Sequence, residues 1–192
     1  MRTGNRERVI ERGLELVHEQ GFNATGVQEI ADAAGIPKGS FYSYFASKED
    51  FGTAILNRYA DASCADLERR LIRAGGSPLD RLRAVFRDWT EESETRDCSR
   101  GCLAGNLCQE MADSSPALRI AVDGVFRRIE GYLAACLREA QAAGELSRDE
   151  DPDELASSLE FAWQGAVMRA KASRSAAPMR GFQEVILPRL LR

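Results

Sequence analysis

The chain has 192 residues, 44% of them hydrophobic and 29% charged, and it carries a formal net charge of −4. No apolar run approaches the roughly 20 residues that span a bilayer, and the polar N-terminus has no signal-peptide core, so we expect a cytoplasmic protein without a membrane partner. The acidic balance argues against a protein that coats nucleic acid without sequence preference, but it is compatible with a small DNA-reading region on an acidic body.

The sequence predicts an all-α fold of about nine helices, because no run of alternating apolar and polar residues is present. Capping boxes mark two helix starts, at Thr25-Gly26-Val27-Gln28 and Ser47-Lys48-Glu49-Asp50. Three more starts have a cap residue before a proline, at Ser77-Pro78, Ser115-Pro116 and Asp151-Pro152. The helices expected from these signals cover residues 4–20, 26–34, 37–45, 48–74, 78–95, 100–112, 116–143, 152–174 and 179–191.

The second and third of these helices are short and are joined by the turn Gly35-Ile36-Pro37, an arrangement typical of a helix-turn-helix. In the third helix, Phe41 and Phe45 can anchor one side in the core. The opposite side then carries small or hydrogen-bonding side chains and no acid, which suits contact with DNA phosphates and base edges. The same pattern is compatible with an amphipathic helix in an ordinary helical bundle.

The stretch around this turn resembles the N-terminal signature of the TetR family of transcriptional repressors. The residues that carry the resemblance are Gly21-Phe22, Thr25, Ile30-Ala31, the run from Ala34 to Phe45, and Ser47-Lys48-Glu49. The resemblance implies that Thr25 caps the second helix. It also implies contact with double-stranded operator DNA through Thr25, Lys38, Gly39, Ser40, Tyr42, Ser43, Tyr44 and Lys48. Tyr44 is a departure, because many members of the family have histidine at this position.

We therefore expect a DNA-binding domain over residues 1–47 and a ligand-sensing and dimerisation domain over residues 48–192. The second domain holds most of the large apolar side chains. Its candidates for either the core or a ligand pocket are Phe86, Trp89, Phe126 and Trp163. The family resemblance implies a cavity for a small-molecule inducer among the fifth to eighth helices.

A cysteine-containing segment opens the sixth predicted helix. A cap at Ser99 or its neighbour would place Cys102 in the first turn, where the helix dipole favours a thiolate. The flanking Arg96 and Arg100 would act in the same direction. Two alternatives stay open: Cys102 is an inert core thiol, or the inducer is an apolar molecule that binds without covalent reaction.

A second resemblance concerns this segment and the end of the eighth helix. Its residues are Gly101-Cys102-Leu103, Leu107, Glu110 and Arg119, together with residues 170–175. They resemble the branch of the TetR family that represses N-ethylmaleimide reductase genes. The resemblance implies that Cys102 responds to electrophiles and oxidants and that Lys171 lies close to it, lowering its pKa.

The last two predicted helices offer apolar surface that one chain need not cover by itself. The eighth carries Phe161 and Gly165, and the ninth has a stripe of Phe182, Val185 and Ile186. The resemblance implies that these helices pair across a two-fold axis in a homodimer. Two DNA-binding domains would then read half-sites of a palindromic operator about 34 Å apart.

Other classes of function have little support. His18 is the only histidine, so a Ser-His-Asp or Cys-His catalytic site is improbable, and we expect no enzyme, no cofactor and no metal. The five cysteines without a secretory signal indicate reduced thiols. A soft-metal site at Cys98, Cys102 and Cys108 is disfavoured, because Cys108 would lie about 80° around the helix from the other two. A helical interaction module that has lost DNA binding is a further alternative, against which the acid-free third helix argues.

Overall fold

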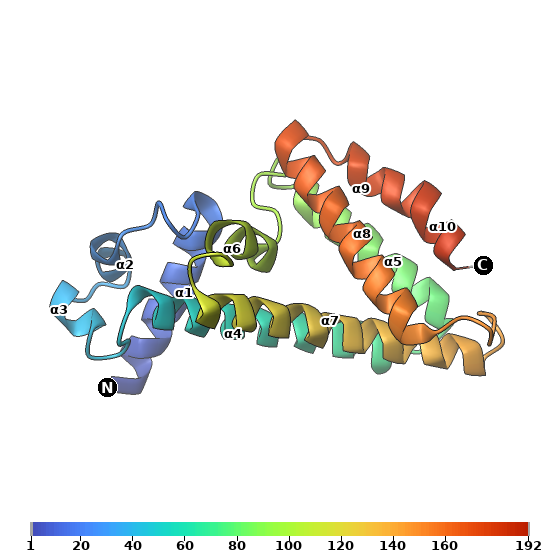
Figure 1. The fold of residues 1–192 in the computed structure, drawn as a ribbon, viewed down its shortest axis with the longest axis horizontal. Coiled ribbons are helices and arrows are strands. Elements are labelled where there is room, and N and C mark those ends of the chain that lie inside the picture. Colours follow the sequence, from blue (N-terminus) through green and yellow to red (C-terminus); the bar gives the residue numbers. More distant parts are fainter. Residues whose placement is uncertain (1, 192) are drawn as a thin grey trace. The chain divides into compact units, whose positions relative to one another are not determined.

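The computed structural model describes residues 2–191, and within that range it contains helices and no strand. Within the described residues, nine continuous helices follow one another, and Figure 1 shows their order along the chain. Their bounds are α1 (Arg2–Gln20), α2 (Val27–Ala33), α3 (Lys38–Phe41), α4 (Lys48–Leu67) continued by the π-helical η1 (Glu68–Ile72), α5 (Pro78–Glu94), α6 (Leu103–Met111), α7 (Pro116–Ala142), α8 (Pro152–Ser173), and α9 (Ala177–Gly181) continued by the π-helical η2 (Phe182–Ile186) and α10 (Leu187–Leu190). The all-α prediction is confirmed. None of these helices is both long enough and apolar enough to cross a membrane.

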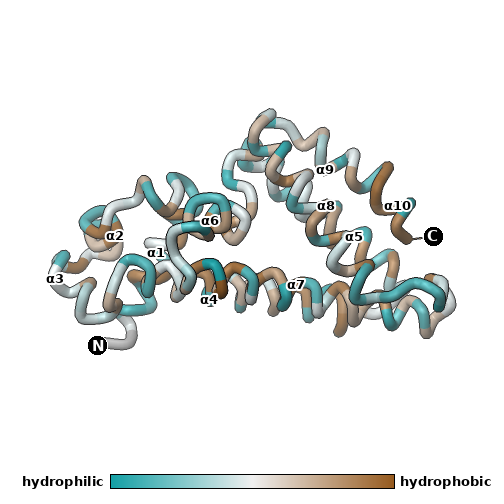
Figure 2. The backbone as a smooth tube through the Cα atoms, viewed as in Figure 1, coloured by the Kyte–Doolittle hydropathy of each residue, from teal (hydrophilic) through white to brown (hydrophobic). Residues whose placement is uncertain are grey.

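Hydrophobic and hydrophilic residues are interleaved along each helix (Figure 2), as expected of helices that bury one face. The predicted caps explain where several helices begin. The Ser77 side chain accepts a hydrogen bond from the Asp80 N–H at 3.2 Å, and Pro78 follows it at the first position of α5. The Asp151 side chain accepts from the N–H groups of Asp153 and Glu154 at the start of α8. These side chains satisfy backbone donors that a helix start leaves without partners.

Two helices are shorter than the sequence predicts. The α-helical part of α3 ends at Phe41, and the chain continues in tight turns whose backbone bonds join Ser43 N to Ser40 O and Tyr44 N to Phe41 O. The second short helix, α6, begins at Leu103 rather than near residue 100. It cannot start earlier, because Asp97, Cys98 and Gly101 have φ values of 50°, 50° and 69°, which a right-handed helix does not accommodate. Cys102 therefore precedes α6 instead of lying in its first turn, which corrects the prediction.

The chain divides into two compact units. The first comprises residues 1–61 and 103–125, and the second residues 62–102 and 126–192. Helices α4 and α7 each contribute residues to both. The boundary predicted at residue 47 was based on the expected roles of the two regions. The compact units, in contrast, group α6 with the N-terminal helices, a grouping that depends on contacts between residues far apart in the sequence.

The core of the first unit is built on phenylalanine. Phe41, Phe45 and Phe51 form a cluster with ring centroids 5.2–5.6 Å apart. Helices α1 and α4 approach closely beside it at Gly13, where an added Cβ would lie 2.4 Å from the Phe51 ring. Helix α6 is fastened to the same unit by Glu110, whose carboxylate accepts hydrogen bonds from the backbone N–H groups of Phe22 (3.1 Å) and Asn23 (2.7 Å). The turn between α1 and α2 is thus tied to a helix almost ninety residues later.

The second unit has an aromatic core of a different composition. Phe86, Trp89, Trp163 and Phe182 lie in contact, with ring centroids 4.9–5.8 Å apart. The cluster joins α5 and α8 to the last helix, which folds back along α8 (Figure 1). Apart from the rings, the Gln183 amide donates hydrogen bonds to Thr90 Oγ1 and to the Phe86 carbonyl. These contacts fix the last helix on α5.

Candidate nucleic-acid interface and sensing body

The turn between α2 and α3 has the geometry of a glycine-terminated helix. Gly35 has a φ of 64°, a left-handed conformation that residues with a Cβ adopt at a cost. Backbone hydrogen bonds close the turn, from Gly35 N to Asp32 O and from Ile36 N to Ala31 O, both at 3.0 Å. This pattern satisfies the last carbonyls of α2 and redirects the chain at once into α3.

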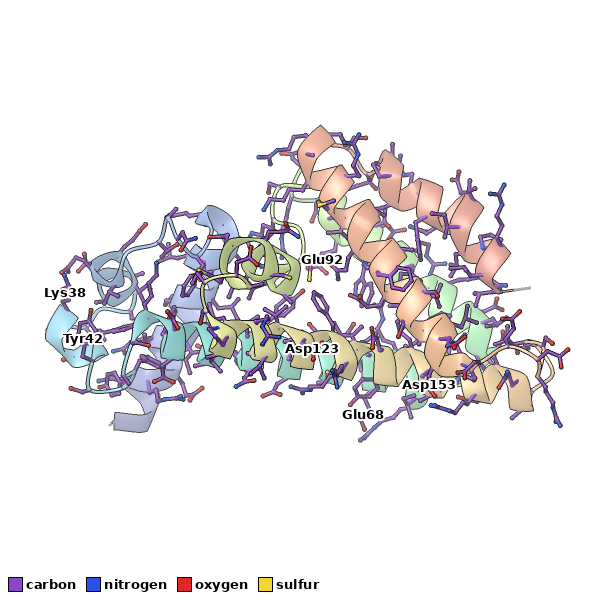
Figure 3. The ribbon with its side chains drawn as sticks, viewed as in Figure 1. Lys38, Tyr42, Glu68, Glu92, Asp123 and Asp153 are labelled. Atoms are coloured by element: carbon purple, nitrogen blue, oxygen red, sulfur yellow. The ribbon has the colours of Figure 1, made fainter. Side chains whose placement is uncertain are left out.

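The outer face of α3 is open and carries no acid. Phe41 and Phe45 are buried as predicted, while Tyr42 is 55% exposed. The other candidate DNA-contacting residues on this segment are exposed (Lys38, Gly39 and Ser43) or half-exposed (Ser40 and Tyr44). An added Cβ at Gly39 would meet no atom within 4 Å, so the lack of a side chain there leaves room for an approaching backbone or base edge. Figure 3 shows the side chains of Lys38 and Tyr42 at α3.

Thr25 does not fill the role that the sequence predicted. The N-cap of α2 is Gly26, without a side-chain hydrogen bond, whereas the Thr25 hydroxyl donates to the Gly21 carbonyl at 2.7 Å. The Thr25 side chain is fully buried and offers no surface to DNA in this structure. It holds the turn between α1 and α2 closed instead. The capping prediction is wrong because a hydroxyl can satisfy a carbonyl behind it as well as an N–H ahead of it.

Lys48 is directed toward its own unit. Its ammonium nitrogen lies 4.6 Å from the centroid of the Phe22 ring, a cation–π contact. Burial lowers the pKa of Lys48 below its ordinary value, and the Glu110 carboxylate opposes that shift. Lys48 thus lies among the contacts between α6 and the turn that joins α1 to α2. Of the two lysines predicted to contact phosphates, Lys38 is the more exposed.

Sequence reasoning missed two arginines near the N-terminus. The Arg8 guanidinium donates to the Ala34 carbonyl at 2.8 Å, at the C-terminal end of α2, where a positive charge is favourable. The Arg6 guanidinium lies 5.2 Å from the Phe45 ring centroid. Both side chains hold α1 to the helix-turn-helix. Their spacing on an early helix of mixed charge gave no signal of these contacts.

The cysteine-containing segment is a strained turn. Asp97 and Cys98 both have φ near 50°, which is uncommon for residues other than glycine. Cys102 is half-exposed at the N-terminal end of α6, while Cys64, Cys98 and Cys136 are buried. The Arg96 guanidinium, expected to favour a thiolate, is paired with the Glu92 carboxylate at 3.3 Å. Lys171 is half-exposed near the end of α8 and, like Cys102, belongs to the second unit. Within residues 2–191 no group of three or more His, Cys, Asp or Glu side chains could hold a metal ion.

The structure brings together three of the four predicted pocket residues. Phe86 and Trp163 are buried in the aromatic cluster, and Trp89 is half-exposed at its edge. Phe126 lies on α7 and is half-exposed. Phe182, predicted for the dimer interface, is a fourth member of the cluster and is only 1% exposed. This corrects the prediction: the last helix packs its Phe182 face on its own chain.

The remaining residues predicted for the dimer interface are exposed or half-exposed. On α8, Phe161 is 64% exposed, and Gly165 and the exposed Met168 follow at intervals of four and three residues, on the same face of the helix. On η2, Val185 and Ile186 are exposed. Both segments belong to the second unit, which therefore presents apolar side chains to solvent on its last two helices.

One buried acid on α8 was missed at the sequence level. Glu160 is 7% exposed and lies on the buried face of the helix, three residues before Trp163. Burial raises its pKa to about 7, and the Glu130 carboxylate adds to the shift, whereas a hydrogen bond from Gln164 opposes it. A sequence pattern cannot show a buried acid, since an acid on a helix is usually solvated.

Comparison with known proteins places this arrangement in a family. Residues 9–55 match the family model described as bacterial regulatory proteins, tetR family, and residues 78–186 match the tetracyclin repressor-like C-terminal domain. The chain is 41% identical to the transcriptional regulator AcuR of Cereibacter sphaeroides over 91% of its length and 80% of the relative's. It is 33% identical to the transcriptional repressor NemR of Escherichia coli over 91% of its length and 87% of the relative's.

Solved structures agree with this assignment. The crystal structure of a TetR regulatory protein from Rhodobacter sphaeroides matches with a TM-score of 0.88 and 39% identity, covering 97% of this chain and 98% of that one. The reduced form of E. coli NemR matches with a TM-score of 0.84 and 31% identity, covering 95% and 96%. The helix-turn-helix, the all-helical body and both family models lead to one conclusion: the chain belongs to the TetR family of bacterial transcriptional regulators, which are not enzymes.

Proposed function

We propose that this chain is a dimeric repressor that reads a palindromic operator through α2 and α3 and is released from it when an inducer acts on the second unit. The observation that carries the proposal is the outer face of α3, which is exposed, lacks acids and stands on a buried phenylalanine cluster. Gly39 and Ser43 would approach the bases, while Lys38, Tyr42 and Tyr44 would contact phosphates. The exposed apolar residues of α8 and η2 support a two-fold dimer.

Release requires that the inducer favour a state of the protein that binds DNA less well. Helix α6 is suited to carry that change. It begins at the residue after Cys102 and ends near Glu110, whose carboxylate holds the turn between α1 and α2. A shift of α6 that weakens these two hydrogen bonds would loosen the support of the helix-turn-helix.

For the inducer, we propose an electrophile or oxidant that modifies Cys102. Its half-exposed position directly before α6 supports this assignment, because a reagent can reach the thiol there. The family relationship to NemR, whose structure is described as a reduced form, is consistent with a thiol-dependent regulator. Lys171 would then act as the nearby positive charge. The alternative is a reversible apolar inducer bound at the aromatic cluster of Phe86, Trp89 and Trp163.

A DNA-binding titration separates these inducers. The DNA is the region upstream of the protein's own gene, at a stated salt concentration, with and without N-ethylmaleimide. We expect the wild type to lose at least about tenfold in affinity on treatment, and Cys102→Ser to keep its affinity. Cys108→Ser, which removes the other half-exposed thiol, is the matched control and should respond like the wild type.

The remaining outcomes are equally informative. Tight binding that the reagent leaves unchanged would discard the cysteine sensor and favour the reversible ligand. If the protein binds neither the upstream region nor any sequence selected from random DNA, the proposal that it is a repressor is contradicted.

A further inference from the structure

Four polar or charged side chains are buried among the described residues, and three of them are hydroxyls with a hydrogen-bond partner. Thr25 donates to the Gly21 carbonyl, Thr90 to the Phe86 carbonyl, and Ser115 to the Glu49 carboxylate. The fourth, Glu160, is only partly satisfied: its carboxyl accepts a hydrogen bond from Gln164, but within residues 2–191 its Oε1 atom is buried and has no hydrogen-bond partner. A buried acceptor without a partner is costly and rare, so its presence in a folded protein needs an explanation.

An amide and a second acid act on Glu160, and an aromatic residue follows it on α8. Trp163 lies on the same buried face of α8, one turn further along, and contacts Phe86 and Trp89. The charged group that acts on the Glu160 carboxyl is another carboxylate, that of Glu130 on α7. The only other unpartnered buried side-chain atom in the described residues is Nε of Arg81, and its guanidinium is fixed by bonds to the Ala74 carbonyl and the Glu139 carboxylate.

For the reversible inducer named above as the alternative to modification of Cys102, we infer that Glu160 is the polar anchor of its site and accepts a hydrogen bond from a small organic cation, a protonated amine on an apolar body. The amine would supply the donor that Oε1 lacks. Its charge would be stabilised by the Glu160 and Glu130 carboxylates and by the faces of nearby indole rings. The apolar body would pack against Trp89, the half-exposed edge of the cluster.

The raised pKa of Glu160 is consistent with this role. Burial and the Glu130 carboxylate bring it to about 7 in the ligand-free chain. A cation beside the carboxyl would favour the charged form that burial disfavours. A cationic ligand would therefore offset the cost of burying a charged Glu160 carboxylate, whereas a neutral ligand would not.

Intrinsic fluorescence offers a direct test, because the chain has only two tryptophans, Trp89 and Trp163, and both belong to the cluster. The intact protein is titrated at pH 8 with three probes that share a phenyl ring: benzylamine, benzyl alcohol and ethylbenzene. We expect benzylamine to bind at least tenfold more tightly than the other two. In Glu160→Gln this advantage should disappear, while ethylbenzene binding changes less than twofold. Glu154→Gln, an exposed acid on the same helix, is the control and should behave like the wild type.

Four results would overturn the inference. The first three are no binding of benzylamine, equal binding of benzylamine and ethylbenzene, and a benzylamine affinity that Glu160→Gln leaves unchanged. The fourth is equal, Glu160-dependent binding of benzyl alcohol and benzylamine. Circular dichroism of each variant and a second variant, Glu160→Leu, distinguish a loss of ligand binding from a loss of folding. Operator binding without any probe is measured in parallel. If it persists in all variants, failure of the amine leaves the repressor assignment intact.

Discussion

In the first unit the buried hydroxyls of Thr25 and Ser115 both have hydrogen-bond partners, whereas the two buried side-chain atoms without partners in the described residues both lie in the second unit. The apolar surfaces differ in the same way. The second unit exposes a stripe on α8 and η2, while the first has Tyr42 and Ile120 as its large exposed apolar side chains. Among the described residues, the first unit therefore leaves no buried side-chain nitrogen or oxygen without a hydrogen-bond partner. The second unit retains groups that the proposed ligand and partner subunit would satisfy.

The largest expected effect concerns the phenylalanine core of the first unit. Phe41→Ala should lower the free energy of unfolding by about 3–5 kcal/mol, because it empties a fully buried site between Phe45 and Phe51. Urea denaturation followed by circular dichroism measures this loss. The adjacent exposed ring is the control: Tyr42→Ala should change the unfolding free energy by about 0.5 kcal/mol or less while weakening operator binding. Equal losses of unfolding free energy in both variants would contradict a core that is packed behind α3.

A second experiment concerns the apolar stripe. Phe161→Asp should weaken the dimer by about 2 kcal/mol or more, roughly a 30-fold rise in its dissociation constant, because it buries a charge in an apolar interface. Sedimentation velocity over a range of protein concentrations measures the change. Ile120→Asp offers a matched control, since Ile120 is also 64% exposed but lies in the first unit. A dimer disrupted by Ile120→Asp and not by Phe161→Asp would place the interface elsewhere.

The pH dependence of stability tests the unsatisfied acid. The pKa of Glu160 is raised from an ordinary 4.5 to about 7 in the folded chain. The folded state therefore holds the proton more tightly than the unfolded state. The contribution of this group to the free energy of unfolding is full below pH 4.5 and falls by up to about 3 kcal/mol as pH rises to 7. Comparing thermal unfolding of the wild type and Glu160→Gln from pH 4.5 to 8 isolates it. Parallel stability curves would show that Glu160 has the same pKa in both states.

The smallest expected effect concerns the hydrogen bonds between Glu110 of α6 and the turn that joins α1 to α2. Glu110→Gln keeps one acceptor oxygen but loses the charge that binds two backbone N–H groups, so the first unit should lose about 1–2 kcal/mol. Amide hydrogen exchange at Phe22 and Asn23 should become about tenfold faster, with little change in the second unit. Glu91→Gln, an exposed acid on α5, serves as the control. Unaltered exchange at both amides would remove Glu110 from the proposed route of release.

Local signals in the sequence were sufficient for most of the helices and for the exposed, acid-free face of α3. Ser77 and Asp151 mark helix starts because a side-chain oxygen and a following proline act within one turn of chain. Gly35 marks the turn of the helix-turn-helix because a left-handed residue ends α2. Phe41 and Phe45 identify the buried side of α3 by their spacing alone, and that spacing also leaves Gly39 and Ser43 outside.

The folded structure decided the rest. Two outcomes are local: the Thr25 hydroxyl donates to the Gly21 carbonyl, and the backbone conformation of residues 97–101 leaves Cys102 outside α6. The third depends on residues far apart in the sequence, because Phe182 packs against aromatic rings of α5 and α8. Glu160 illustrates the limit best, because its burial and its missing hydrogen-bond partner depend on which helices surround α8. The sequence by itself determined the helical elements, the exposed and acid-free face of α3 and the family, since these depend on neighbours within one or two turns. Only the tertiary structure decided which side chains remain unsatisfied, because burial is a property of the packed helices together.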